Sequence, residues 1–288
     1  MADFNIEEHI LTLPQLQNRK RTVRVLLPPG YHDEPARRYP VLYMHDGHNL
    51  FFADTATYGT HWQIGETMNA MATSGDPRRV IIVGVDCNHG RDGMARLDEY
   101  SPWINTGIGE LLSRADGVTA AGGDGAAYTD FITDTLIPWT EQHYRTVATA
   151  GSRGIAGSSM GGLISLYALY QKPDSFRLAG AFSSAFWFAK EQVMEHLAAH
   201  YQPDKAVYLD IGTAETSDPS KPDFARRYLQ DTLDVRDYLV SCGQELSELP
   251  CVIEEAAVHN EAAWARRFPG FIDWALQRLE GALPGEQK

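Results

Sequence analysis

Short apolar runs alternate with amphipathic stretches along most of the chain. Runs that end at Pro, Gly or polar turns have the pattern of buried strands, and they cover residues 22–27, 41–44, 80–85, 153–156, 206–211 and 251–253. Apolar residues three and four positions apart predict helices over residues 65–72, 163–170, 223–240 and 261–279. This alternation is typical of an α/β fold, with a mostly parallel sheet covered by helices on both faces.

Composition limits the class of protein. A chain of 288 residues, 43% of them hydrophobic, can build one large core, so we expect a single domain over residues 1–288. The net charge of −13, with no block of Lys and Arg, argues against a nucleic-acid partner. The first residues are acidic where a secretory signal would be basic, and no apolar run reaches membrane-spanning length. We therefore expect a cytoplasmic protein with no membrane partner; whether it forms a homo-oligomer stays open.

Two further segments have simple expectations. The three cysteines, Cys87, Cys242 and Cys251, show no paired spacing and are expected to be buried thiols. The small-residue run over residues 120–127 is expected to be a loop, and it either borders a site or is a surface excursion.

One short segment, G-I-A-G-S-S-M-G-G, joins a predicted strand to a predicted helix. A serine between two glycines in this context is typical of a nucleophile elbow, where side chains at the glycine positions would collide. Ser159 has Gly157 and Gly161 at these positions, whereas Ser158 has Ala156 and the bulky Met160 there. The pattern predicts Ser159 as the nucleophile. A phosphate-binding loop is disfavoured because no Lys-Ser/Thr pair follows.

A nucleophilic serine needs a histidine base and a carboxylate that orients the base. His259 lies between the last predicted strand and the last helix, the position expected for the histidine of an α/β-hydrolase. In the loop after the strand at 206–211, Glu215 is the preferred acid and Asp218 is the alternative. Asp210 lies within that strand, where we expect it to make a structural hydrogen bond.

Backbone N–H groups are expected to form the oxyanion hole. One belongs to Met160, directly after the nucleophile, and the other to His48, in the loop after the strand at 41–44. Gly47 allows the chain to turn there.

Aromatic and charged residues near these loops have two interpretations each. Trp62, Trp103, Trp187 and Trp264 either pack in the core or wall a cleft, and Trp187 is preferred as a wall because it follows a strand end. Arg96, close to Asp98 and Glu99 in sequence, is expected to form an ion-paired turn rather than to bind substrate.

Histidines also suggest metal ligands in two places. His196 and His200 lie four residues apart on a helix, which more often indicates a solvated helix face. His45, Asp46 and His48 lie close together after a strand, but no matching fourth ligand accompanies them. We therefore expect no metal and no organic cofactor.

Five segments together resemble the putative-esterase family of α/β-hydrolases, which includes enterochelin, feruloyl and acetyl-xylan esterases, S-formylglutathione hydrolase and mycolyltransferases. They are residues 43–51, 96–102, 157–162, 212–215 and 259–264. The likeness spans about residues 21–279, and the G-S-S-M-G-G block and the late histidine loop are its most specific parts.

The resemblance implies an α/β-hydrolase fold and a serine esterase that cleaves a small-molecule carboxylic ester through an acyl-enzyme. It makes Ser159 the nucleophile, His259 the base and Glu215 the acid, although the family's frequent aspartate keeps Asp218 open. Glutamine or an apolar residue is common in relatives at position 48, so the His48 side chain becomes a candidate for the substrate pocket. An acyltransferase or amidase with the same triad, and a catalytically silent binding protein, are the alternatives.

Overall fold

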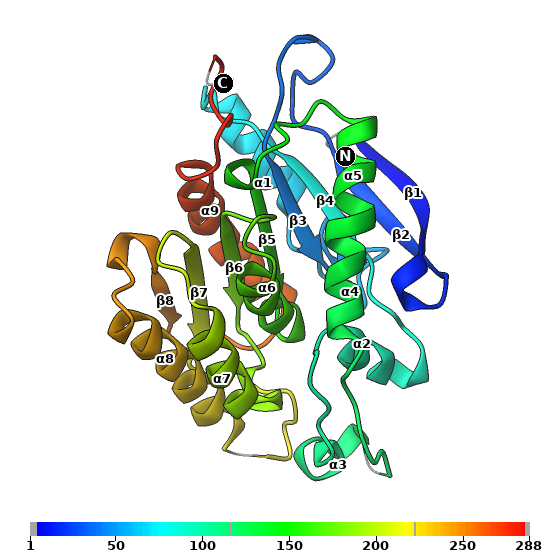
Figure 1. Cartoon of the computed structure of the whole chain (residues 1–288), viewed down its shortest axis with the longest axis vertical. Coiled ribbons are helices and arrows are strands. Elements are labelled where there is room, and N and C mark those ends of the chain that lie inside the picture. The colour runs from blue at the N-terminus through cyan, green and yellow to red at the C-terminus, as the bar shows by residue number, and fades with distance from the viewer. Residues whose placement is uncertain (1–4, 116, 222, 286–288) are drawn as a thin grey trace.

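The computed structural model describes residues 5–285 apart from 116 and 222, and within this part of the chain it contains an eight-stranded sheet. The strand order is β1-β2-β4-β3-β5-β6-β7-β8. The strands are β1 (Ile6–Leu13), β2 (Arg19–Leu26), β3 (Val41–His45), β4 (Ile81–Val85), β5 (Arg153–Ser158), β6 (Leu178–Phe182), β7 (Ala206–Gly212) and β8 (Cys251–Glu254). Only the β1–β2 and β2–β4 pairs are antiparallel, so the predicted mostly parallel sheet is confirmed (Figure 1).

Helices cover both faces of the sheet, as predicted. They are α1 (Ile64–Thr73), α2 (Met94–Glu99), α3 (Ile108–Leu111), α4 (Gly125–Phe131), α5 (Ile137–His143), α6 (Met160–Gln171), α7 (Lys190–His200), α8 (Phe224–Ser241) and α9 (Glu261–Leu276). A π-helical turn, Ile132–Leu136, joins α4 to α5.

Alternating side chains of the strands supply two separate cores. On β3, Tyr43 packs into the core that includes residues of α4 to α8, whereas Leu42 and Met44 pack into the core that includes residues of α1 and α9. All three are at most 1% exposed. A strand buried on both faces reads as a continuous apolar run, which explains why ranges for β3, β4, β5 and β7 could be predicted. No range was predicted for β6, although it is equally buried. In Figure 1, helices α4 to α8 lie on one face of the sheet, and α1 and α9 lie on the other.

The edge of the sheet differs most from the sequence expectation. No strand was expected at residues 6–13, yet β1 pairs along its whole length with β2, from Ile6 opposite Leu26 to Leu13 opposite Arg19. Most β1 side chains are partly or fully exposed. A half-exposed strand with acidic residues has no apolar run, so its sequence pattern does not indicate a strand. Pairing with β2 orders it.

Two further boundaries move. The predicted loop at 120–127 ends early, because Gly125 begins α4 and its Cα lies against the Ser101–Pro102 backbone, where a Cβ would come within 2.4 Å. The last helix ends at Leu276 rather than residue 279.

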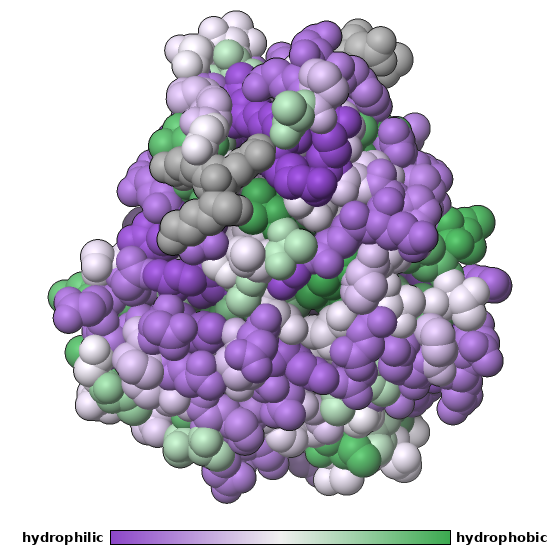
Figure 2. Space-filling model, turned by 45° about the horizontal axis from the view of Figure 1, so that its top comes forward, coloured by the Kyte–Doolittle hydropathy of each residue, from purple (hydrophilic) through white to green (hydrophobic). Residues whose placement is uncertain are grey.

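Loops after the parallel strands β3 to β8 all leave the same edge of the sheet, where sites form in α/β proteins. The face in Figure 2 is mainly hydrophilic, with hydrophobic residues in small scattered groups. Within the described residues, no helix combines the length and the apolar character needed to cross a membrane.

Candidate active site

Ser159 occupies a strained corner between β5 and α6. Its backbone has φ 60° and ψ −121°, a conformation that residues other than glycine seldom adopt. The corner is held on both sides, because the Ser159 N–H donates to the Phe182 carbonyl at 2.8 Å and its carbonyl accepts from the Ala185 N–H at 3.0 Å. A Cβ on Gly157 would lie 3.0 Å from the Gly161 carbonyl carbon. The two glycines therefore allow the close approach that the turn requires.

His259 lies in the loop between β8 and α9, paired with Glu215. Its Nδ1 is 2.7 Å from Glu215 Oε2, and its ring packs between Tyr228, at 5.0 Å between centroids, and Trp264, at 5.1 Å. Burial opposes ionisation of Glu215, but hydrogen bonds from His259, Ser183 and Gly212 override it and hold the pKa of this carboxyl below its ordinary value. An ionised carboxylate only accepts hydrogen bonds, so Nδ1 carries the imidazole proton and the Nε2 lone pair is left free.

Asp218, the alternative acid, forms hydrogen bonds with Ser113 and Ser220 instead of His259. It accepts hydrogen bonds from the Ser113 N–H at 2.6 Å and from Ser220, and the Ser220 hydroxyl contributes most to lowering the pKa of its carboxyl. Asp210 accepts from the Ser183 N–H at 3.2 Å, as expected of a structural residue, and burial raises its pKa to about 7. Of the carboxylates considered from the sequence, the structure brings Glu215 to His259.

Sequence reasoning missed the residues that hold Glu215. Ser183 Oγ donates to Glu215 Oε1 at 2.6 Å and accepts from Trp264 Nε1 at 2.9 Å and from Arg267 Nη2 at 2.8 Å. The Gly212 N–H donates to the same carboxylate oxygen at 2.8 Å. All of these donors are buried with Glu215, which is 0% exposed, so the carboxylate has a fixed position and orientation.

A cavity of about 300 Å³ brings the site residues together. Ser158, Ser159, His48, His259 and Trp264 line it. Met160 begins α6 beside it, and the first N–H groups of a helix have no intrahelical acceptor. The N-terminus of α6 is therefore a suitable place for a negatively charged oxygen.

The loop that carries His48 is shaped by its neighbours. Asp46 has a φ of 56°, and a Cβ on Gly47 would lie 2.7 Å from the Gly84 carbonyl carbon, so only glycine fits there. The His48 ring is buried; its Nε2 lies 3.0 Å from Thr57 Oγ1, and burial lowers the pKa of its imidazole. The structure thus places the His48 side chain in the cavity wall.

Arg96 makes an ion pair that the sequence did not predict. It contacts Asp46 through two hydrogen bonds of 2.8 and 2.7 Å. The predicted ion pairs of Arg96 with Asp98 and Glu99 are therefore wrong. Burial opposes ionisation of Asp46, but the guanidinium overrides it and sets the pKa at about 2. Arg96 also donates to the Ser158 carbonyl at 3.3 Å and thereby joins the β3 loop to the elbow.

The four tryptophans considered as walls of a cleft lie in different parts of the structure. Only Trp264 among them lines the cavity, while Trp62 is 2% exposed and packs against Trp264, with 5.6 Å between ring centroids. Trp103 lies beside Tyr167 on the other helix layer. Trp187, the preferred wall, is 4% exposed and packs against Phe224 at 5.1 Å, outside the lining of this cavity.

The histidine groups weighed as metal sites are engaged in other contacts. His45 Nδ1 lies 2.9 Å from the Tyr128 hydroxyl and Asp46 is paired with Arg96, so these two do not join His48 in a metal-ligand group. The expected solvated helix face is wrong for His196, which is buried against Trp103, and burial lowers its pKa to about 4. His200 is exposed, as expected.

Of the three thiols, only Cys87 is buried, which corrects the expectation for the other two, Cys242 and Cys251. Burial raises the pKa of the Cys87 thiol.

A mostly parallel sheet with a serine at a strand–helix elbow, followed by an acid and a histidine in chain order, defines the α/β-hydrolase class. Residues 15–273 match the model of the family described as Putative esterase, and the chain belongs to that family. It is accordingly an enzyme of the carboxylic ester hydrolase class.

Individual relatives share less than a third of their residues with this chain. The chain is 28% identical over 266 residues to an uncharacterized protein, YbbA, of Bacillus subtilis (strain 168). The aligned region covers 92% of this chain and 96% of the relative. A ferulic acid esterase superposes with a TM-score of 0.69 at 16% identity, covering 96% of this chain and 99% of that one. The siderophore hydrolase EstA from Aspergillus nidulans gives a TM-score of 0.70 at 15% identity, covering 94% of this chain and 95% of that one.

Proposed function

We propose that the chain hydrolyses a small-molecule carboxylic ester through an acyl-enzyme on Ser159, with His259 as general base and Glu215 as the orienting acid. The observation that carries the proposal is the 2.7 Å Glu215–His259 pair on the cavity that contains the strained Ser159. Pairing, order in the chain and the shared cavity together match the requirements of this chemistry.

His259 transfers the proton in both halves of the reaction. Ser159 Oγ attacks the ester carbonyl carbon while His259 Nε2 accepts its proton. The imidazolium, stabilised by Glu215, then gives that proton to the departing alcohol as the ester C–O bond breaks. In the second half, His259 takes a proton from water, the hydroxide attacks the acyl carbon, and the proton returns to Ser159 Oγ as the acid is released.

The developing oxyanion is the charge that the site has to stabilise. We assign this to the backbone N–H groups of Met160, at the start of α6, and His48, in the Gly47–Asn49 turn. Asp46, one of two acidic residues that line the cavity, is paired with Arg96, which reduces the opposition of its charge to the oxyanion.

Cavity size bears on the substrate. About 300 Å³ lies at the small end of the range for ligand pockets. Some relatives in the fold are named for ferulic acid esters and siderophores. We propose a small ester, with the His48 side chain contacting one end of it.

Hydrolysis of p-nitrophenyl acetate by purified Ser159→Ala and Ser158→Ala tests the nucleophile. Loss of a triad nucleophile costs about 10⁶ in turnover, so Ser159→Ala should be nearly inactive while Ser158→Ala stays within about tenfold of wild type, ~1.4 kcal/mol of barrier. Equal loss in the two variants would refute the assignment. Formation of a new ester when an alcohol is added would favour the acyltransferase alternative instead, and release of the free acid supports hydrolysis.

A further inference from the structure

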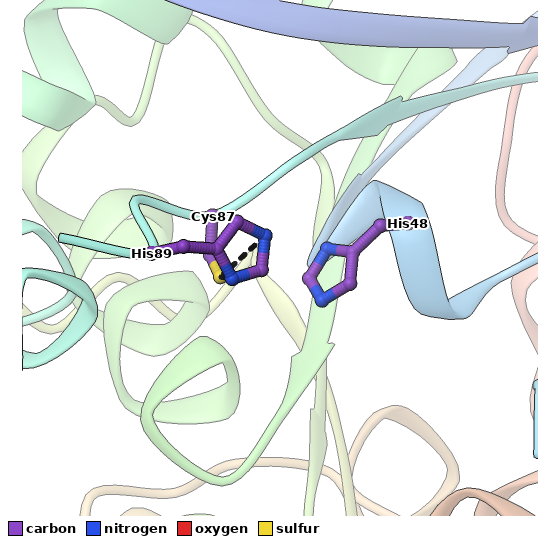
Figure 3. A group of neighbouring side chains, drawn as sticks. All are labelled: His48, Cys87 and His89. Atoms are coloured by element: carbon purple, nitrogen blue, oxygen red, sulfur yellow. Dashed lines mark hydrogen bonds between the residues drawn. The ribbon is translucent and has the colours of Figure 1, made fainter. Parts of the chain in front are cut away.

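Three metal-binding side chains converge on the cavity wall from two neighbouring loops. His48 follows β3, and Cys87 and His89 follow β4. These strands are parallel partners, with His45 opposite Val85, so the two loops leave the sheet at the same level. One potential ligand atom from each of the three side chains lies within 4.8 Å of the other two, and Figure 3 shows the His48 ring turned toward His89 and Cys87.

A second observation points to a missing ligand at this place. The His48 side chain is buried, and its Nδ1 has no hydrogen-bond partner in the part of the chain that the structure describes. The Cys87 sulfur lies 3.7 Å from His89 Nδ1 and 3.9 Å from His89 Nε2, both long contacts. Buried polar atoms are rarely left without a partner unless something else binds them.

We propose that His48, Cys87 and His89 bind one Zn²⁺ ion. One thiolate and two imidazoles form a donor set that suits Zn²⁺, and three protein ligands leave the fourth tetrahedral position for water. Binding replaces the Cys87 thiol proton, which passes to solvent as the Zn–S bond forms.

The surroundings fit a three-ligand site. Tetrahedral bonds of about 2.0 to 2.3 Å place one sulfur and two nitrogen ligands roughly 3.3 to 3.6 Å apart, so atoms now within 4.8 Å need only small shifts. His89 is exposed and has room to make them. The nearby carboxylates Asp46 and Asp86 are paired with Arg96 and Arg24, which keeps them from serving as a fourth ligand.

The ion would act on the esterase site, a consequence that rests on the proposed function. All three ligands line the cavity that contains Ser159. A Zn²⁺ ion and its water would occupy part of about 300 Å³ and would restrain the loop whose His48 N–H we assign to the oxyanion hole. Ester turnover should therefore fall when Zn²⁺ binds and recover when EDTA removes it.

Binding is tested without any activity assay, by titrating Zn²⁺ into the full metal-free chain against a chromophoric chelator. We expect one Zn²⁺ per chain, and binding weaker by about tenfold or more in Cys87→Ser and in His89→Ala. Cys242→Ser and His143→Ala, which remove the same residue types elsewhere, should bind as wild type does. Absence of stoichiometric binding, or equal binding in all four variants, would overturn the site.

Cobalt gives an independent readout that does not depend on the folding of a variant. Co²⁺ bound to wild type should show a thiolate-to-cobalt charge-transfer band, and a bound ion without that band would overturn Cys87 as a ligand. Turnover is measured separately. If the chain hydrolyses no ester, the zinc titration still decides the site; if Zn²⁺ binds and turnover is unchanged, the inhibitory consequence is refuted.

Discussion

Replacing Glu215 by glutamine tests the orienting acid with almost no change of shape. In the wild type, Oε2 accepts the His259 Nδ1 proton at 2.7 Å, and Oε1 accepts from Ser183 and Gly212. The amide oxygen of glutamine can keep the Ser183 and Gly212 bonds. Its NH₂ group then faces Nδ1–H, and two donors cannot form a hydrogen bond.

The imidazole is therefore expected to shift its proton to Nε2, the atom that should act as base. Amide replacement of a triad carboxylate costs about 10⁴ in turnover for this reason, which corresponds to ~5.4 kcal/mol of barrier. The substitution also removes a stabilising charge. Because the folded pKa of Glu215 lies below its ordinary value, the carboxylate stabilises the fold above that ordinary pKa and the stabilisation is lost as pH falls through the folded pKa.

The assay is steady-state hydrolysis of a p-nitrophenyl ester, with a melting curve of each variant to separate lost chemistry from lost fold. Asp218→Asn is the matched control, because Asp218 binds Ser113 and Ser220 instead of His259. We expect the 10⁴ loss in Glu215→Gln alone. If folded Glu215→Gln keeps turnover within about tenfold of wild type, ~1.4 kcal/mol, Glu215 is not the orienting acid.

Two other predictions follow from the geometry. Turnover should fall as the pH is lowered and the histidine base becomes protonated. The carboxyl of Glu215 is not the source of this fall, because its pKa lies below the ordinary value. Asp210, whose pKa is about 7, is the competing source, so the fall should persist in Asp210→Asn, and a profile flat to pH 4 would exclude a histidine base. Gly157→Ala should destabilise the fold by about 1–3 kcal/mol, because its Cβ meets Gly161 and His45 at 3.0 Å. Gly270→Ala, in α9 with open space around the new Cβ, should instead stabilise by up to ~1 kcal/mol; denaturant unfolding of both variants would contradict the account if the two shifts had the same sign.

Local patterns were enough to predict the elbow and the central strands β3, β4, β5 and β7, but gave no range for β6. Ser159 could be chosen over Ser158 because a Cβ on Gly157 would meet Gly161, only four residues away, so the requirement is visible in the local spacing of the glycines. β1 could not be predicted in this way, since its half-exposed side chains become ordered only through pairing with β2.

Contacts between distant segments explain what the sequence left open. Arg96 finds its carboxylate 50 residues away in Asp46, although Asp98 is a closer neighbour in the chain. The Cys87–His89 pair meets His48 only because β3 and β4 are adjacent in the sheet, an order that hydrophobic patterns do not specify. The position of His89 two residues after Cys87 was the available signal.

The central claim is that Ser159 carries the acyl group. Wild-type protein treated with a fluorophosphonate and analysed by intact mass and peptide mapping tests it most directly. We predict one adduct per chain, located on Ser159, with turnover lost in proportion to labelling and no adduct in Ser159→Ala. An adduct on another residue, or turnover that persists in fully labelled protein, would contradict the account.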